Sequence, residues 1–294
     1  MSPAPATASV RIESALEAAL SRADGGLAPP GLAAAMRHAV FPGGARVRPQ
    51  LCLAVAQACG GDEPALAEAA AAAVEFLHCA SLVHDDMPCF DDAAARRGRP
   101  SVHKAFGAPL ALLSGDALIV LAYSTLAQAG AVAPARLAAL IQVISRGVGM
   151  PLGIVAGQAW ESEPNPPLEL YHQAKTGALF VAATMAGAVA AGADPHPWRA
   201  LGERMGLAYQ AADDLLDAIA TPEEAGKPTG QDAAHLRPSL VAELGLRGAY
   251  ARLESLVGEC MAAIPSCEGS RELKDLVARQ ATRLAPKSLA QSAA

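Results

Sequence analysis

The feature that most constrains the fold is a group of aspartates inside an apolar helical segment, residues 205–217. Asp213, Asp214 and Asp217 occur there in the pattern Asp-Asp-Leu-Leu-Asp. On a helix that turns about 100° per residue, Asp213 and Asp217 lie about 40° apart around the axis and about 6 Å apart along it. Carboxylates that share a buried face repel each other and are costly to desolvate. The fold must therefore bring a cation to this face.

A second group of aspartates occurs earlier in the chain, at Asp85, Asp86 and Asp91. In a straight helix Asp91 would lie about 120° away from Asp85. Pro88 stands between them and should kink or end the helix, which allows Asp91 to come back toward Asp85. Hard oxygen ligands of this kind favour Mg²⁺, especially when a substrate carries phosphate. The main predicted magnesium ligands are Asp85, Asp91, Asp213 and Asp217, with Asp86 and Asp214 in support.

The remaining segments favour an all-α fold. Hydrophobic residues make up 52% of the chain, enough for a large core, whereas aromatic residues, which favour strands, make up only 4%. Alanine, the best helix former, is abundant, as in residues 65–74. Apolar residues recur at helical spacing, as in residues 137–144, and no segment shows sustained alternation with a period of two. We therefore expect a disordered tail over residues 1–8 and a single all-helical domain over residues 9–294.

Composition also limits the partners and the location. The net charge of −6 offers no basic surface for nucleic acid. The six cysteines form no CxxC pair, so we interpret them as small buried hydrophobes in a reducing cytoplasm. The first residues lack a basic region followed by an apolar one, so no secretory signal is expected. Two uncharged stretches, residues 117–135 and 177–193, approach the length of a membrane span. Their Ala, Gly, Ser and Thr content favours buried helices over integral membrane segments.

Several motifs, in the same order, resemble a known family. Residues 82–92, followed by residues 96–101, resemble the first aspartate-rich motif of the trans-isoprenyl diphosphate synthases. The spacing of the aspartates is similar to that of the bacterial geranylgeranyl and farnesyl diphosphate synthases. Other matching segments are residues 43–49, 113–118, 157–158, 175–179, 209–217 and 226–227, together with Asp232. The resemblance covers about residues 30–250.

The resemblance implies a bundle of long helices around a deep central cavity, the isoprenoid synthase fold, with the two aspartate groups facing each other across its mouth. Members are usually homodimers that condense isopentenyl diphosphate head to tail with allylic diphosphates. The reaction depends on Mg²⁺, which stabilises the departing diphosphate. Catalytic roles would fall to the six aspartates with Arg96, Arg97, Lys175 and Lys227.

The same resemblance assigns the diphosphate-binding residues. Arginine matches phosphate oxygens with a planar fork, and lysine serves as a point charge. The residues expected to hold the allylic diphosphate are Arg96, Lys175, Thr176, Gln210 and Lys227, and those expected to hold isopentenyl diphosphate are Arg48, Arg97 and His78. Outside this set, His84, His103, Asp116 and Trp160 are interpreted as structural.

The chain departs from the family in its first substrate motif. Ala45 stands where the family has a lysine that contacts isopentenyl diphosphate. The loss of one charge-assisted contact would cost about 1.5–3 kcal/mol. We expect the adjacent Arg46 to fill this gap, so that activity survives with weaker binding of isopentenyl diphosphate. Near Gly157 and Gln158, Glu161 replaces the usual aspartate.

Ala80 and Ser81 bear on the length of the product. In farnesyl synthases of this bacterial type a bulky aromatic residue usually lies five residues before the first aspartate, where this chain has Ala80. One helical turn, about 5.4 Å, is close to the length of an isoprene unit, so a small residue here deepens the cavity. We predict geranylgeranyl diphosphate (C20) as the product, with farnesyl diphosphate (C15) as the alternative. The candidates for the cavity floor are Leu77, Leu112, Leu113 and Phe180.

Other functions use related residues. A class I terpene cyclase also has a DDxxD motif, but pairs it with an Asn/Ser/Glu motif, whereas this chain has a second DDxxD. A head-to-head synthase would show DxxxD motifs instead. A regulatory partner subunit of a related synthase is favoured only by Ala45 and is opposed by the two intact aspartate groups.

Overall fold

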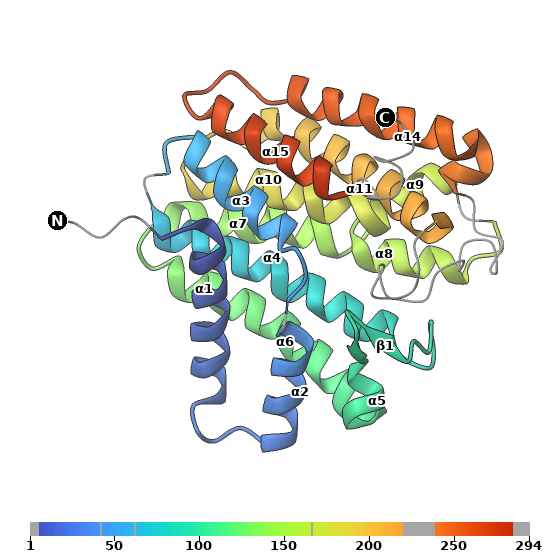
Figure 1. Ribbon diagram of the computed structural model, residues 1–294. Helices are drawn as coiled ribbons and strands as arrows, with labels where there is room; N and C mark the ends of the chain where they lie inside the picture. Colours follow the sequence, from blue (N-terminus) through green and yellow to red (C-terminus); the bar gives the residue numbers. More distant parts are fainter. Residues whose placement is uncertain (1–5, 42, 62, 166, 220–238, 285–294) are drawn as a thin grey trace.

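Helices make up nearly all of the structure (Figure 1). The computed structural model describes residues 6–41, 43–61, 63–165, 167–219 and 239–284. The α-helices are α1 (Ala8–Asp24), α2 (Pro30–Val40), α3 (Val47–Ala58), α4 (Pro64–Asp85), α5 (Val102–Phe106), α6 (Ala108–Ala129), α7 (Pro134–Val148), α8 (Ile154–Ala159), α9 (Leu168–His172), α10 (Ala178–Ala190), α11 (Arg199–Ile219), α14 (Leu240–Ala262) and α15 (Ser270–Leu284). Shorter elements are the 3₁₀ turns η1 (Trp160–Ser162) and η3 (His196–Trp198), the π-helical turn η2 (Gln173–Gly177), and the strands β1 (Ala95–Arg96) and β2 (Arg99–Pro100). The all-α prediction is confirmed.

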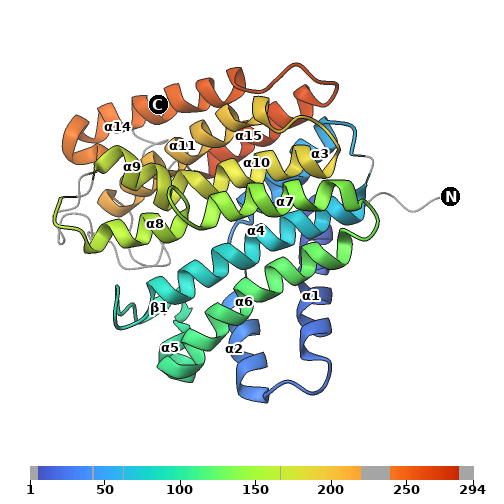
Figure 2. The same cartoon turned by 180° about the vertical axis from the view of Figure 1, so that it is seen from behind.

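α10 lies at the centre of the bundle and packs against α3, α4, α7 and α11 (Figures 1 and 2). Nearly all of its residues are buried and most are small, which suits a helix that is surrounded on every side. Gly187 allows the closest approach, because a Cβ atom there would lie only 2.3 Å from the carbonyl oxygen of Cys52 on α3. The uncharged stretch over residues 177–193 is therefore a core helix, as predicted.

α4 and α6 run side by side, and α4 carries the first aspartate group at its C-terminal end (Figures 1 and 2). Both helices are long and apolar enough to cross a membrane, but most of α4 is buried in the bundle and α6 packs against it along one face. The uncharged stretch over residues 117–135 is not one helix, because α6 ends at Ala129 and α7 begins at Pro134.

α1 and α2 form a hairpin on the side of the bundle opposite α14 and α15 (Figure 1). The hydroxyl of Thr7 accepts a hydrogen bond from the backbone N–H of Val10 at 3.4 Å and so caps α1. The first helix therefore begins at Ala8, one residue earlier than expected. The rest of the predicted tail, residues 1–5, lies outside the described residues.

Candidate active site

A cavity of about 1060 Å³ opens between α4, α6, α8, η2 and α11. Its lining includes carboxylates from two facing parts of the bundle: Asp85 and Asp91 from the end of α4 and the loop that follows, and Asp213 and Asp217 from α11. Apolar side chains line the rest, among them Leu77, Ala80, Ile119, Val148, Ile154 and Leu179. The deep cavity and the facing aspartate groups agree with the sequence prediction. A charged rim over an apolar interior suits a substrate with an anionic head and a hydrocarbon tail.

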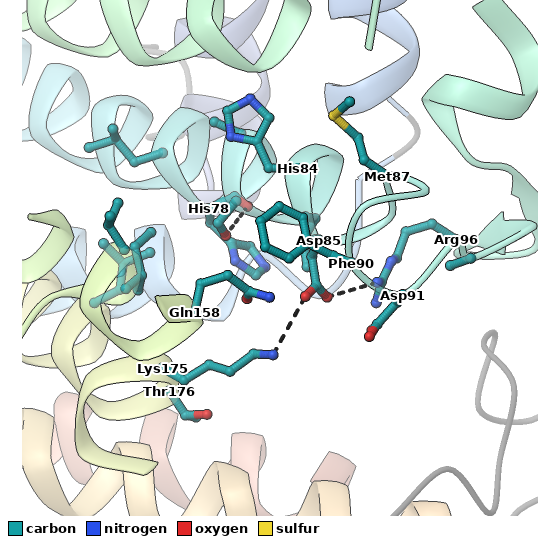
Figure 3. A pocket seen from close by; sticks show the side chains of 18 of the residues that line it. His78, His84, Asp85, Met87, Phe90, Asp91, Arg96, Gln158, Lys175 and Thr176 are labelled. Carbon is teal, nitrogen blue, oxygen red and sulfur yellow. Dashed lines mark hydrogen bonds and ion pairs between the residues drawn. The ribbon is translucent and has the colours of Figure 1, made fainter. Parts of the chain in front are cut away.

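The end of α4 brings Asp85 and Asp91 together. The helix ends at Asp85, and the chain turns through Pro88. The backbone N–H of Asp91 then donates to the carbonyl of Asp85 at 3.1 Å. Figure 3 shows the two carboxylates close together beside Arg96. The predicted return of Asp91 toward Asp85 is therefore confirmed.

Asp86 and Asp214 face away from this cavity. Asp86 is 3% exposed, and its Oδ1 accepts bonds from Arg96 Nε at 3.0 Å and Nη2 at 2.6 Å. Asp214 accepts from Gln210 Nε2 at 2.8 Å and from the N–H of Leu240 at 2.7 Å. Burial raises the pKa of both carboxyl groups above the ordinary value, although these donors oppose the shift. Neighbouring residues on a helix point about 100° apart, so only one aspartate of each adjacent pair lines the cavity. The supporting part in holding magnesium that the sequence assigns to these two residues stays a prediction.

Glu161 holds Lys175 at the cavity. The Lys175 Nζ lies 2.5 Å from Glu161 Oε1. It also lies 3.5 Å from Asp85 Oδ1 (Figure 3). Glu161 also accepts hydrogen bonds from Gln158 Nε2 at 2.8 Å and from the Tyr171 hydroxyl at 2.7 Å. Glu161 and Tyr171 were not among the predicted site residues. The available signal was the glutamate that replaces the family's aspartate shortly after Gln158.

The π-helical turn η2 is held from two sides. Turns of this kind are frequent at functional sites. On one side, Thr176 Oγ1 donates to Gln210 Oε1 at 2.7 Å, and the Gln210 amide in turn donates to Asp214. On the other side, Gly157 of α8 lies so close that a Cβ atom would be 2.3 Å from the backbone nitrogen of Lys175. The backbone that carries Lys175 and Thr176 is thus wedged between α8 and α11.

A second cavity, of about 280 Å³, brings together the three residues predicted to hold isopentenyl diphosphate, Arg48, His78 and Arg97. The Arg48 guanidinium carbon lies 4.3 Å from the Phe180 ring centroid, and its buried Nε has no hydrogen-bond partner among the described residues. The pKa of His78 lies well below its usual value because burial, followed by the charges of Arg48 and Arg97, disfavours the imidazolium. Asp213 lines both cavities, so the two predicted diphosphate sites adjoin.

Arg46, the residue expected to take the place of the missing lysine, is held by other partners. Its Nε donates to Glu13 at 2.8 Å, Nη1 to Glu75 at 2.6 Å, and Nη2 to the carbonyl of Val40 at 2.8 Å. The side chain is 3% exposed, and these bonds engage all three of its nitrogens. A buried carboxylate such as Glu75 is costly to desolvate without a cationic partner, so the ion pair with Glu75 stabilises Arg46 in its inward orientation. Arg46 also lines the smaller cavity, but its three nitrogens are already engaged, so the expectation that it fills the gap left by Ala45 stays a prediction that this geometry does not favour.

The apolar part of the cavity agrees in part with the predicted floor. Of the predicted residues, Leu77, Ala80, Ser81 and Leu112 line the cavity, whereas Leu113 and Phe180 do not. Phe180 instead lies beneath Arg48. The further wall residues come from α6, α7, α8 and α10, and no local motif marks them. Lys227, predicted to bind the allylic diphosphate, lies outside the described residues.

Two histidines interpreted as structural differ in their placement. His103 is 8% exposed and bonds to Ser101 Oγ at 3.0 Å and to Asp92 Oδ1 at 3.1 Å, which fits the structural interpretation. His84, in contrast, lines the larger cavity, with its Nε2 3.7 Å from Asp116 Oδ1.

The chemistry of the cavity carboxylates fits magnesium. Among the residues that the structure describes, no group of three acidic, histidine or cysteine side chains is gathered closely enough to form a ready-made metal site. Asp85, Asp91, Asp213 and Asp217 border a shared space instead. Mg²⁺ keeps several waters and binds through one or two carboxylates together with substrate phosphates. An open arrangement of carboxylates facing a substrate cavity is therefore compatible with this ion.

Comparison with known proteins points to one family. The Polyprenyl synthetase family model matches residues 29–273. The chain is 54% identical over 280 residues to a geranylgeranyl diphosphate synthase of Cereibacter sphaeroides, covering 95% of this chain and 97% of the relative. It is 53% identical over 267 residues to a geranylgeranyl diphosphate synthase of Rhodobacter capsulatus, covering 91% of this chain and 92% of the relative.

Solved structures show the same fold. A geranyltransferase from Legionella pneumophila matches with a TM-score of 0.79 and 27% identity, over 94% of both chains. A geranyltransferase from Helicobacter pylori, complexed with magnesium and isoprenyl diphosphate, matches with a TM-score of 0.77 and 29% identity, over 96% of this chain and 99% of that one. The family model and the relatives agree with the aspartate-lined cavity, and the chain belongs to the polyprenyl synthetase family.

Proposed function

We propose that this protein is a Mg²⁺-dependent prenyltransferase that condenses isopentenyl diphosphate head to tail with allylic diphosphates and produces geranylgeranyl diphosphate. The observation that carries the proposal is the placement of Asp85, Asp91, Asp213 and Asp217 around one deep apolar cavity. Relatives more than 50% identical over nearly the whole chain carry the name geranylgeranyl diphosphate synthase.

The reaction starts with cleavage of the C1–O bond of the allylic diphosphate, which leaves an allylic cation and pyrophosphate. When bound, Mg²⁺ supplies Lewis-acid stabilisation of the negative charge on the departing group. The aspartates at the cavity hold the metal, while Lys175 and Arg96, which line the same cavity, bind phosphate oxygens. Preorganised charges of this kind act most strongly where water is excluded.

The second substrate occupies the smaller cavity in this proposal. Arg48 and Arg97 bind its diphosphate, and His78, neutral at pH 7, donates or accepts a hydrogen bond without adding charge. The double bond of isopentenyl diphosphate attacks the allylic cation and forms the new C–C bond. Loss of a proton from the resulting cation to the departing pyrophosphate completes the reaction, so no dedicated protein base is required.

The product length follows from the walls of the larger cavity. Ala80 and Ser81 leave its α4 side open at the level where an aromatic residue would close it. Leu77, one turn further from Asp85, and Ile119 of α6 line the deeper part and are buried or half-buried. We assign the floor to these two residues together with Val148. A C20 chain is the product expected from this depth.

A homodimer in the cytoplasm completes the proposal. α6 exposes a large part of Leu113 and Val120, at 51% and 68%, two apolar side chains that lie two turns apart on one face of the helix. A second copy would cover this face. All six cysteines are free thiols, which fits a reducing compartment. Sedimentation of the wild type and of Val120→Asp tests the dimer: we expect the variant to be monomeric, and an unchanged sedimentation coefficient would contradict this assignment of the interface.

The purified chain tests the function directly. It is incubated with labelled isopentenyl diphosphate and dimethylallyl, geranyl or farnesyl diphosphate, with Mg²⁺ or with EDTA, and the products are separated by chain length. We expect C20 from all three starters and no product with EDTA. A C15 end point would contradict the assigned depth. Release of a hydrocarbon from farnesyl or geranylgeranyl diphosphate alone would indicate a cyclase, and absence of turnover by the pure chain would indicate a partner subunit.

A further inference from the structure

Arg46 adopts a backbone conformation that side chains other than glycine rarely take. Its φ is +50° and its ψ is +37°, the left-handed region, and it stands immediately before α3. A residue with a Cβ atom is strained in this region unless the surroundings hold it there. No side chain caps the start of α3. The Gln50 amide donates to the carbonyl of Ala45 at 2.9 Å, and the Arg46 side chain anchors the turn to the neighbouring helices.

The Arg46 side chain connects three helices. It donates to Glu13 of α1 and to Glu75 of α4, and it also donates to the last carbonyl of α2, at Val40. Arg46 and Glu75 are each 3% exposed, so this ion pair is shielded from water and from salt. An arginine with all its nitrogens engaged fixes the turn before α3 in both position and orientation.

The turn held by Arg46 carries Arg48 into the smaller cavity. Arg48 forms no ion pair among the described residues; it stacks on Phe180 at 4.3 Å and lies 5.6 Å from the Tyr209 ring centroid. Its buried Nε points to no protein acceptor in those same ranges. The direction of this guanidinium therefore depends on the backbone of residues 46–48 and on the two rings, because no ion pair among the described residues holds it.

The preceding glycines connect the same turn to Arg97. A Cβ atom on Gly43 would lie 2.1 Å from the guanidinium carbon of Arg46, and one on Gly44 would lie 3.1 Å from Arg97 Nε. The loop thus runs in close contact between the guanidinium groups of Arg46 and Arg97, which both line the smaller cavity. A movement of Arg46 would shift the surface against which Arg97 rests.

We propose that Arg46 is a positioning residue for the isopentenyl diphosphate subsite: its bonds to Glu75 and Glu13 set the direction of the Arg48 side chain and the position of the loop against which the Arg97 side chain packs. This inference rests on the proposed function. The inference also bears on Ala45. Because the lysine is absent there and the nitrogens of Arg46 are bound in the interior, the subsite depends on Arg48 and Arg97, and Arg46 positions both of them.

The test compares Arg46→Lys and Arg46→Met with Arg11→Ala. Arg11 Nε bonds to Glu68 at 2.7 Å and, like the Arg46 network, joins α1 to α4, but it lies away from the turn before α3. For each variant, kcat and the KM values for isopentenyl and allylic diphosphate are measured together with the thermal midpoint. Wild-type turnover in the same assay establishes the prenyltransferase activity independently of any variant.

We expect Arg46→Met to raise the KM for isopentenyl diphosphate about tenfold or more, which corresponds to one lost charge-assisted contact, while the allylic KM changes less than about twofold. Arg46→Lys should recover part of the loss because a lysine keeps the charge but not the fork. Arg11→Ala should lower the thermal midpoint without a change in either KM. Equal changes in both KM values, or an unchanged KM for isopentenyl diphosphate, would overturn the proposal.

A second variant covers the case in which Arg46→Met does not fold because Glu75 is left buried and uncompensated. Replacing the pair together, as Arg46→Met with Glu75→Met, removes both charges and should restore the fold. The folded double variant should keep the raised KM for isopentenyl diphosphate, because the bonds that orient the turn are still missing. A wild-type KM in this variant would also overturn the proposal.

Discussion

Gly157 is the position where one methyl group should disable the site without touching the substrate. In the structure a Cβ atom at Gly157 would lie 2.3 Å from the backbone nitrogen of Lys175 and 2.4 Å from its Cα. Ordinary contacts begin at about 3.4 Å, so in Gly157→Ala either α8 or the η2 backbone must move by roughly 1 Å. A misplacement of this size can cost about 100-fold in rate. We therefore expect kcat to fall by about two orders of magnitude.

The assay for Gly157→Ala measures kcat and both KM values with saturating Mg²⁺, alongside unfolding by urea. Gly258→Ala is the matched control, because it also replaces a helical glycine and its new methyl group would meet no atom within 4 Å. Since alanine is the better helix former by about 1 kcal/mol, the control should be slightly more stable and fully active. A kcat for Gly157→Ala within threefold of wild type would show that the η2 backbone does not need its observed position.

Three further predictions concern single side chains. Ala80→Tyr should shorten the main product from C20 to C15 because the ring would fill the cavity on its α4 side; an unchanged product length would show that the floor lies elsewhere. Ala45→Lys should lower the KM for isopentenyl diphosphate about tenfold or more by restoring one charge-assisted contact, and a KM equal to that of wild type would contradict the assignment of the smaller cavity. His78 has a folded-state pKa far below its ordinary value of 6.5, so below about pH 6.5 the unfolded chain binds a proton that the folded chain does not. This group should therefore lower the free energy of unfolding by up to about 1.4 kcal/mol for each unit by which the pH falls. Urea titrations at several pH values between 6.5 and 5 should show that the free energy of unfolding depends less steeply on pH in His78→Asn than in wild type; an equal pH dependence would contradict the burial of a neutral imidazole.

Local periodicity was sufficient to predict the parts of the site that one helix or one turn determines. Asp213 and Asp217 line the cavity as their spacing predicts, and Pro88 ends α4 so that Asp91 returns to Asp85. The same reasoning ranked Asp86 and Asp214 below their neighbours as ligands, but it did not identify the donors that hold them, Arg96 and the N–H of Leu240, because these come from other parts of the chain.

Residues whose roles depend on distant partners could not be predicted. Arg46 turns inward because Glu75, 29 residues away, is buried, and burial is a property of the assembled bundle. Likewise, Ile119 and Val148 line the cavity because α6 and α7 meet α4 at that depth. The short strands β1 and β2 have only two residues each, too few for a periodic pattern in the sequence.

The unequal contacts of Lys175 explain how a single cation can serve both the resting site and the reaction. Its Nζ makes a short bond to Glu161 at 2.5 Å and a long one to Asp85 at 3.5 Å. Asp85 is also one of the four aspartates that would hold Mg²⁺, and in that role its carboxylate would have less to offer the Lys175 ammonium. The weaker contact is the one that would be released, while Glu161, which has two further donors of its own, keeps the ammonium in place. We therefore expect Lys175 to exchange Asp85 for a phosphate oxygen when the allylic substrate binds, so that no unpaired charge is left buried at either stage.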